Sequence, residues 1–467
     1  MPALVEELRS DPQIGLARSH GRHRHGAPAR TRHNAALYRA LIICLCLIPA
    51  PAAAEGFRAD RLLLTWQRDP TSTMTIQWME PGRLHPIDQH LLGIRRPMPF
   101  EYIPPAVGEL RYWKRGSDHS EEMLAQMELT AIVRWPGMFI QRVELTGLEA
   151  GSEYRFRGGD SAEDYGFRTA PADLSEPFRL ALGGDTRHEQ KLMERTNAVA
   201  MRYKPDVIVW GGDLAYGDGR QENLYRWEEW FDANYKTLID EDRRVVPIII
   251  AIGNHEVRGS FYSNIPNYQP TNEVRLRLAP YFFQFFAFPG QPGYNVLDFG
   301  SYLSLIALDT NHTNPIRGEQ TEWLERVLAD RAHVPHVLPF YHIPAFPSHR
   351  EYAGSHSRQI RQHWLPLFEK YGVELAFENH DHAYKRTHPI RYGKIDASGV
   401  TYIGDGAWGV GVRKVHDVEA TWYLARAQTI RHAIILTLHG TQRHLLVVSE
   451  TGEIIDELPS TGLIRAR

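Results

Sequence analysis

The region from about residue 57 to 171 has the hydrophobic pattern of β-structure. At 74–78, Met, Ile and Trp alternate with Thr and Gln, and because strand side chains point to opposite faces in turn, this predicts a half-buried strand. A similar run begins at Val143. A Leu, a turn and then Tyr154 follow, as in the tyrosine corner of a β-sandwich. The Pro-rich stretch 85–105 predicts a long loop.

After an Ala-, Pro- and Ser-rich linker at 169–177 the pattern changes. Runs that are mainly apolar alternate with helical patterns such as 189–203 and 319–331. The apolar runs include 178–182, 207–210 and 246–252. Strands without alternation indicate a sheet that is covered on both faces, with helices between the strands.

The N-terminus has the order of regions found in a secretory signal peptide. A basic stretch ends at Arg39, an apolar run covers 40–48, and small residues reach Ala54. We therefore expect 1–54 to be a signal peptide with a long basic region, cleaved near Ala54 in a secreted or periplasmic protein. The run is short for a membrane span; the alternative is a buried or membrane-anchoring segment.

Composition narrows the function classes. The chain has 467 residues, 43% hydrophobic and 23% charged, which is ordinary for a globular protein of more than one domain. A net charge of −3 gives no basic field for nucleic acid or for anionic membranes. Both cysteines, Cys44 and Cys46, lie in the expected signal peptide. A mature chain without cysteine would bind metal through nitrogen and oxygen alone.

Five short polar motifs follow apolar strands of the second region. They are Gly184-Asp185-Thr186, Gly212-Asp213-Leu214-Ala215-Tyr216, Gly253-Asn254-His255-Glu256, His342-Ile343-Pro344 and His380-Asp381-His382-Ala383-Tyr384. Ligands of open α/β sheets bind beyond the carboxyl ends of strands. Glycine allows the sharp turn that aims the next side chain into the site. A carboxylate can bridge two metals.

Each motif alone is ordinary, since Gly-Asp is typical of turns and Asn-His of an Asx-turn. Together and in this order they resemble the calcineurin-like metallophosphoesterases. Tyr216, three residues after Asp213, and the run from His382 to Arg386 resemble the purple acid phosphatases in particular.

The resemblance implies a set of seven metal ligands. A first metal would be held by Asp185, Tyr216 and His382, a second metal by Asn254, His342 and His380, and Asp213 would bridge them. Three departures from the family pattern leave the ligands intact: Arg187 replaces a Gly, Pro339 a Val and Asn379 a Gly.

Three further residues are candidates for catalysis. His255, next to Asn254, matches a family histidine that contacts the phosphate, and His349 is a looser match for another. We expect Arg187 to contact the phosphate as well, since a guanidinium fork suits its oxygens.

The resemblance also implies the architecture. We expect an α/β fold: a four-layer α/β/β/α metallophosphoesterase sandwich at 177–458, preceded at 57–171 by a fibronectin type III-like β-sandwich. The late strands at 433–438 and 444–449 would close the second sheet.

The function expected is hydrolysis of small phosphate monoesters by a metal-bound hydroxide, as in an acid phosphatase. One alternative is a phosphodiesterase on the same scaffold. Another is a surface-binding protein with a vestigial metal site. We expect no nucleic acid as a structural partner and no stable membrane insertion after signal cleavage, and the oligomeric state stays open.

Tyr216 suggests the identity of the metals. A phenol with a pKa of about 10 ligates near neutral pH only when a metal removes its proton, which a trivalent ion does best. The binuclear centre should therefore hold iron(III) at the Tyr216 site and a divalent iron, zinc or manganese ion at the other.

Overall fold

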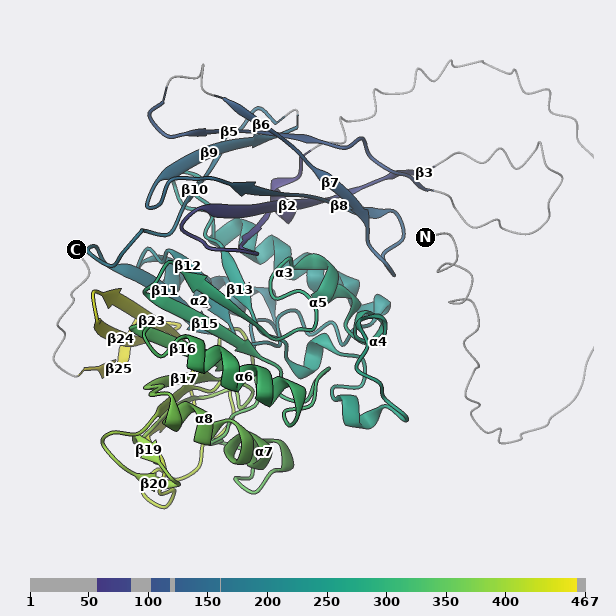
Figure 1. Cartoon of the computed structure of the whole chain (residues 1–467). Helices are drawn as coiled ribbons and strands as arrows, with labels where there is room; N and C mark the ends of the chain where they lie inside the picture. Colours follow the sequence, from purple (N-terminus) through teal and green to yellow (C-terminus); the bar gives the residue numbers. More distant parts are fainter. Residues whose placement is uncertain (1–56, 85–101, 118–121, 160, 460–467) are drawn as a thin grey trace, which may run out of the picture. The chain divides into compact units, whose positions relative to one another are not determined.

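A computed structural model describes residues 57–84, 102–117, 122–159 and 161–459, all within one compact unit (Figure 1). The expected signal peptide and most of the predicted loop at 85–105 lie outside these residues. Within that loop, Tyr102–Ile103 forms strand β4, which pairs with β3 (Arg83–Leu84). The prediction of loop structure up to residue 105 was therefore wrong at its end.

The first described region contains two four-stranded antiparallel sheets, in the orders β1-β2-β8-β7 and β10-β9-β5-β6. Their strands are β1 Leu63–Thr65, β2 Thr73–Pro81, β5 Glu109–Lys114, β6 Met123–Gln126, β7 Glu128–Ala131, β8 Met138–Thr146, β9 Glu153–Gly158 and β10 Tyr165–Arg168. Large side chains such as Trp66, Trp78 and Phe156 are buried in their core. The hydroxyl of Tyr154 accepts a hydrogen bond from the Glu149 N–H at 2.9 Å, so the tyrosine corner is confirmed.

Strand β2 corrects one prediction. The alternation at 74–78 predicted a half-buried strand, yet Thr75 and Gln77 are as buried as their apolar neighbours. The polar face is covered because it meets helix α5 (Pro280–Phe285): the Gln77 side chain donates to the Phe285 carbonyl at 2.5 Å. Polar residues here mark a contact with the second region, not a contact with water.

The second region contains two larger sheets, in the orders β13-β12-β11-β23-β24-β25 and β14-β15-β16-β17-β21-β18-β22. The strands of the first are β11 Phe178–Gly183, β12 Val207–Trp210, β13 Ile248–Ile250, β23 His432–His439, β24 Gln442–Ser449 and β25 Ile454–Leu458. Those of the second are β14 Asn295–Phe299, β15 Leu303–Leu308, β16 His336–Tyr341, β17 Leu375–Glu378, β18 Tyr384–Thr387, β21 Thr401–Gly404 and β22 Leu424–Gln428. A short hairpin is formed by β19 Ile390–Arg391 and β20 Lys394–Ile395.

The helices cover the outer faces of these sheets. They are α2 Gln190–Met201, α3 Leu224–Thr237, α4 Asn272–Leu278, α5, α6 Glu319–Asp330, α7 Ser355–His363 and α8 Leu365–Lys370. Alternate residues of one strand enter different cores: Val209 faces the other sheet, whereas Ile208 and Trp210 pack with α2 and α3. In the second sheet Leu305 faces inward, and Ile306 packs towards α6 and α8. The four-layer α/β/β/α architecture is thus confirmed, and it explains why the central strands are apolar on both faces.

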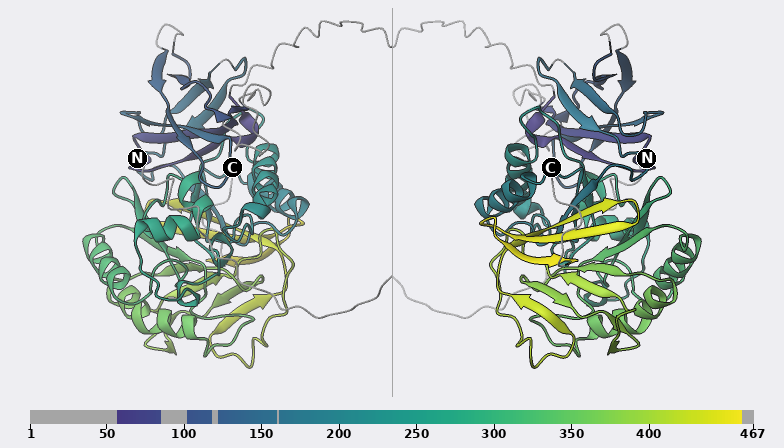
Figure 2. Two further views of the ribbon diagram at one scale, coloured as in Figure 1. Left: turned by 90° about the vertical axis from the view of Figure 1, so that its right-hand side faces the viewer. Right: turned by 90° about the vertical axis from the view of Figure 1, so that its left-hand side faces the viewer.

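The late strands form as predicted but in a different sheet. β23 pairs antiparallel with β11, so β23, β24 and β25 extend the first sheet (yellow strands in Figure 2). β11 pairs parallel with β12 along one edge, and its other edge is the one that β23 occupies.

Across the residues that the structure describes, helices with the length and apolar character of a membrane span are absent.

Candidate metal centre

The five polar motifs lie beyond the ends of parallel strands. Asp185, Asp213 and Asn254 follow β11, β12 and β13, which are parallel neighbours in one sheet. His342 and His380 follow β16 and β17, which are parallel neighbours in the other sheet. Because the carboxyl ends of parallel strands lie at one edge, each sheet presents its motifs together.

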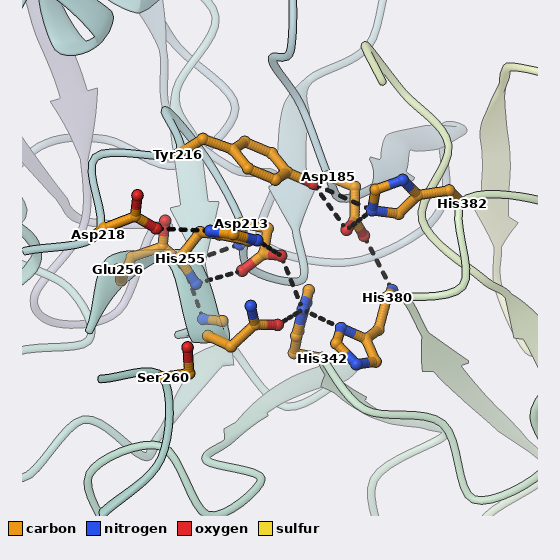
Figure 3. A network of polar contacts seen from close by, with 12 residues as sticks. Asp185, Asp213, Tyr216, Asp218, His255, Glu256, Ser260, His342, His380 and His382 are labelled. Carbon is orange, nitrogen blue, oxygen red and sulfur yellow. Dashed lines mark hydrogen bonds and ion pairs between the residues drawn. The ribbon is translucent and has the colours of Figure 1, made fainter. Parts of the chain in front are cut away.

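Asp185, Tyr216 and His382 form a first group of donor atoms. The Tyr216 hydroxyl lies 3.1 Å from Asp185 Oδ1 and 3.1 Å from His382 Nε2, and those two atoms are 3.0 Å apart. The three side chains converge on one point (Figure 3), and all are almost completely buried.

Asp213, Asn254, His342 and His380 form a second group, centred on His342 Nε2. That nitrogen lies 3.1 Å from Asp213 Oδ2, 3.0 Å from Asn254 Oδ1 and 2.9 Å from His380 Nδ1. Asp213, His342 and His380 together have the geometry of a metal-binding cluster. The two groups are linked, because the backbone N–H of His380 donates to Asp185 Oδ2 at 2.9 Å.

These spacings suit metal ions better than direct hydrogen bonds. One nitrogen cannot satisfy three close donors and acceptors at once. Ligands at right angles and about 2.1 Å from an ion lie about 3.0 Å from each other, which matches every edge of the first group. The residues present therefore fit a pair of metals.

The imidazoles are oriented by backbone carbonyls. His342 Nδ1 donates to the Gly211 carbonyl at 3.0 Å, and His382 Nδ1 donates to the Gly411 carbonyl at 3.2 Å. With the proton held on Nδ1, each Nε2 keeps a lone pair directed into the groups described above. Metal-ligating histidines are typically fixed in this way.

The backbone of the centre is strained. Five of the seven predicted ligands have positive φ angles, between 53° and 81°: Asp185, Asp213, Tyr216, His380 and His382. Non-glycine residues rarely adopt this region, and the cost of order 1–3 kcal/mol each persists where the surroundings or function require it.

Two glycines leave room for ligand atoms. A Cβ on Gly406 would lie 1.8 Å from Asp185 Oδ2 and 2.6 Å from the backbone nitrogen of His380. A Cβ on Gly253 would lie 2.3 Å from Asp213 Oδ1. The backbone thus approaches both carboxylates more closely than any other residue allows.

Glu256 supports the second group without belonging to it. Its carboxylate accepts hydrogen bonds from the N–H groups of Asp213, Leu214 and Gly253 at 2.7, 2.8 and 2.8 Å. These bonds fix the turn that carries Asp213 to the turn that carries Asn254.

Burial and the concentrated charges shift the pKa values of the donors. Burial raises the pKa of Tyr216 well above its usual range, and the carboxylates of Asp185 and Asp213 raise it further. Burial lowers the pKa of His342, but the charges of Asp213 and Asp185 outweigh it and raise the pKa to about 9. Cations are therefore favoured here, whether protons or metal ions.

His255 lies beside this centre. Its Nδ1 donates to Asp218 Oδ1 at 2.6 Å, its Nε2 is 4.0 Å from Asp213 Oδ2, and its ring packs on Tyr216 at 4.3 Å. Burial lowers the pKa of His255, but Asp213 and the Asp218 hydrogen bond leave it raised. The ring is partly exposed, with Nε2 facing the metal centre.

His349 is exposed at the edge of the His380–His382 loop. Its backbone N–H donates to Asp381 Oδ2 at 2.7 Å, and its Nδ1 donates to the Lys414 carbonyl at 2.8 Å. The neutral ring then offers only an acceptor at Nε2. A role for His349 as an acid therefore requires its doubly protonated form and stays a prediction.

Arg187 is not grouped with the predicted ligands. Its guanidinium pairs with Glu229 of α3, and the residue is 5% exposed. Burial, together with the charge of Arg226, lowers its pKa to about 10. Nothing in this geometry supports the predicted contact with phosphate. The next residue, His188, is exposed and packs against Tyr216 and His382 at ring distances of 4.5 and 5.3 Å.

Sequence reasoning assigned no role to Asp218, Glu256 or His188. All three lie within two residues of a predicted site residue, so proximity in sequence was an available signal. Their roles depend on contacts between separate loops, which spacing does not reveal.

Comparisons with known proteins agree with this geometry. Residues 178–384 match the family model for calcineurin-like phosphoesterases. Purple acid phosphatase 18 of Arabidopsis thaliana is 25% identical over 305 residues, covering 63% of this chain and 64% of that protein. Purple acid phosphatase 15 of the same plant is 26% identical, and the match covers 59% of this chain and 55% of that protein. The chain thus matches less than two thirds of the length of these relatives.

A bacterial relative and two solved structures extend the comparison. An uncharacterised protein of Mycobacterium tuberculosis is 28% identical over 212 residues, covering 41% of this chain and 36% of that one. The purple acid phosphatase PPD1 from yellow lupin seeds has a TM-score of 0.66 at 17% identity, and the match covers 85% of this chain and 73% of that one. PhoD has a TM-score of 0.58 at 14% identity, and the match covers 87% of this chain and 94% of that one. Both structures share the fold.

Proposed function

We propose that this chain, which is a purple acid phosphatase-like metallophosphoesterase, is a two-metal hydrolase of phosphate monoesters. The observation that carries the proposal is the pair of linked donor groups, one of which includes the phenol of Tyr216. Asp185, Tyr216 and His382 would hold one metal, and Asn254, His342 and His380 the other. Asp213, which lies 3.1 Å from His342 in the second group, would bridge the two metals.

Bound metals would neutralise the oxygens of a phosphate and supply a water of lowered pKa as nucleophile. The protein's part is to hold these donors in fixed positions. The carbonyl-fixed imidazoles and the strained turns do so before substrate arrives, and preorganisation of this kind is a main source of catalysis.

His255 is the residue best placed to exchange a proton with the leaving group. Asp218 fixes its ring through Nδ1, and Nε2 faces the centre. The two nearby carboxylates favour its protonated form, as an acid that donates to an alkoxide requires. His349, beside the His380–His382 loop, is proposed as a second contact to the substrate.

The metals proposed are iron(III) with Tyr216 and a divalent iron, zinc or manganese ion in the other group. The choice rests on the donor set, since a hard trivalent ion is the best match for a phenolate. The centre would then act on small phosphate esters in a secreted or periplasmic protein.

The test is metal analysis and turnover on the same purified sample. We expect about two metal ions per chain and turnover of p-nitrophenyl phosphate well above that of bis(p-nitrophenyl) phosphate. His342→Gln should lose metal and activity together, whereas His363→Gln, at the end of α7, should change neither. Faster turnover of the diester would favour a phosphodiesterase. Full metal loading without turnover of either ester would contradict a hydrolase.

A further inference from the structure

His188 lies at the edge of the metal centre on the side of His382. Its ring packs against the edges of Tyr216 and His382, and its backbone N–H donates to the Gly409 carbonyl at 2.8 Å. It is exposed, unlike the predicted ligands. The residue therefore lines the approach to the centre.

The hydrogen bonding of His188 makes it a donor towards that approach. The Gly411 N–H donates to His188 Nδ1 at 3.3 Å, so the proton of the neutral ring resides on Nε2. A protonated Nε2 cannot ligate a metal, but it can donate to an anionic oxygen. His188 is therefore suited to bind substrate and not to extend the metal-ligand set.

Arg413 follows two residues after Gly411 on the same loop. Its backbone N–H donates to the His382 carbonyl at 2.9 Å, and its Nη1 donates to the His380 carbonyl at 3.3 Å. Among the described residues it has no carboxylate partner, whereas Arg350, beside the same loop, pairs with Asp381 at 2.6 Å. Most of the N–H groups of Arg413 are thus left for another acceptor.

The loop that joins these residues is tightly fixed. The Gly409 N–H donates to the Asp185 carbonyl at 3.0 Å, and a Cβ on Gly409 would lie 1.8 Å from the Thr186 carbonyl oxygen. His188, Gly411 and Arg413 are therefore held on the backbone that carries Asp185 and His382. Donors fixed in advance bind an anion at a lower entropic cost.

We propose that His188 and Arg413 form a second anion-binding subsite next to the metal centre, and that it binds a second phosphoryl group of the substrate. The proposal rests on the proposed function, because the first phosphoryl group occupies the metal centre. A guanidinium with free donors and an imidazole N–H are what an oxyanion requires. The substrate class favoured is therefore a phosphoanhydride, in which two phosphoryl groups are directly linked.

The test is calorimetric binding of inorganic diphosphate and orthophosphate to the metal-loaded protein. We expect diphosphate to bind about tenfold more tightly, in keeping with one or two charge-assisted hydrogen bonds. Arg413→Met and His188→Phe should each remove most of this preference while orthophosphate affinity and metal content stay within about twofold. Arg358→Met, which removes an exposed arginine of α7, is the matched control and should keep the preference.

Two results would overturn the subsite. One is equal binding of the two anions by the unaltered protein. The other is an equal loss of affinity for both anions in the Arg413 and His188 variants. Turnover of p-nitrophenyl phosphate is measured on the same samples. A protein with the diphosphate preference but no turnover would contradict the phosphatase and leave the subsite standing, and the converse result would contradict the subsite alone.

Discussion

At the scale of single residues, Tyr216 sets the chemistry of the centre apart. Its hydroxyl is held 3.1 Å from both Asp185 and His382, in a site where burial and two carboxylates raise its pKa. A phenol in such a site gives up its proton only to a strong Lewis acid. The same features that keep Tyr216 protonated without metal would make it, as a ligand, selective for a trivalent ion.

We predict that the iron-loaded protein is visibly coloured by phenolate-to-iron(III) charge transfer and that Tyr216→Phe loses this colour. The measurement is a visible spectrum of both proteins, each with iron quantified. Tyr225→Phe, at an exposed position on α3, serves as the control and should keep the colour. A colourless protein with full iron content, or a coloured Tyr216→Phe variant, would show that Tyr216 is not a ligand.

Glu256 gives a prediction about support of the ligands. Glu256→Gln preserves size but replaces an acceptor oxygen by an N–H₂ group that faces backbone N–H groups. We expect metal affinity to fall by roughly 10- to 100-fold, as is usual when a partner of metal ligands is lost. Competition with a chelator measures this, with Glu228→Gln on α3 as control. Unchanged affinity in a folded Glu256→Gln protein would show that the turn holds without the carboxylate.

The sequence predicted the site residues that lie in short motifs. It missed the residues whose roles depend on contacts between distant parts of the chain. Asp185, Asp213 and the motif histidines come together as expected, because each follows a strand end. The pairing of Arg187 with Glu229 depends on how α3 packs against the β11 turn. The hydrogen bond that His188 Nδ1 accepts comes from a loop more than 200 residues later in the chain. Neither relation leaves a local pattern.

At the scale of elements, the turn after β21 decides whether two ligands can approach. Gly406→Ala should sharply reduce metal content, because its Cβ would overlap Asp185 Oδ2. Gly393→Ala in the β19–β20 hairpin is a matched control. Its φ of 69° resembles the 65° of Gly406, but a Cβ there has nothing within 4 Å. Equal metal loss in both variants would mean that an alanine at positive φ, and not the clash with Asp185, reduces metal binding.

Element predictions succeeded where a strand's environment is uniform. β12 is apolar throughout and β11 is apolar except for Arg179, because sheets or helices cover both faces. β2 was misjudged because its Thr and Gln side chains meet another part of the protein instead of water. The late strands were assigned to the wrong sheet because pairing with β11 is a long-range choice that periodicity does not encode.

Strand β23 carries a histidine that should make stability depend on pH. His432 is 1% exposed and packs on Tyr384 at 5.1 Å, and burial lowers its pKa to about 4. An unfolded histidine has a pKa of about 6.5, so between pH 6.5 and 4 only the unfolded state binds the proton. Stability should therefore fall as pH drops through this window, by up to about 3 kcal/mol.

His432→Phe keeps a ring against Tyr384 and removes this titration. We expect the free energy of unfolding of the variant to fall less than that of the unaltered protein between pH 7 and pH 4.5, as measured by urea denaturation. Other groups titrate equally in both proteins and cancel in the difference. Parallel pH dependences would show that His432 has the same pKa in the folded and the unfolded protein.

At the scale of the whole molecule, the two regions share hydrophobic core and polar contacts. One continuous cluster of buried side chains includes Trp66 and Trp78 of the first region and Leu180 and Phe299 of the second. Across the same boundary Arg142 donates to the Gln284 carbonyl at 2.8 Å. We therefore predict a single calorimetric unfolding transition for the protein. Two well-separated transitions would show that the regions unfold independently.

The last prediction separates this structural dependence from catalysis. A chain that begins at Leu174 lacks the first region, and removing it uncovers the part of the shared core around Phe299 and the backbone acceptors of Gln284 and Phe285. We expect its unfolding temperature to fall by about 10 °C or more, because several kcal/mol of buried apolar contact are lost. All seven proposed ligands remain, however, so the folded fraction should bind metal at the same ratio per chain as the full protein. Arg142→Met is the milder counterpart: it should lower the unfolding temperature by a few degrees and leave metal content unchanged. Near-ultraviolet circular dichroism identifies the folded fraction. If the shortened chain keeps a native spectrum and yet binds no metal, the first region must help to form the centre, and the assignment of the site to the second region alone would be wrong.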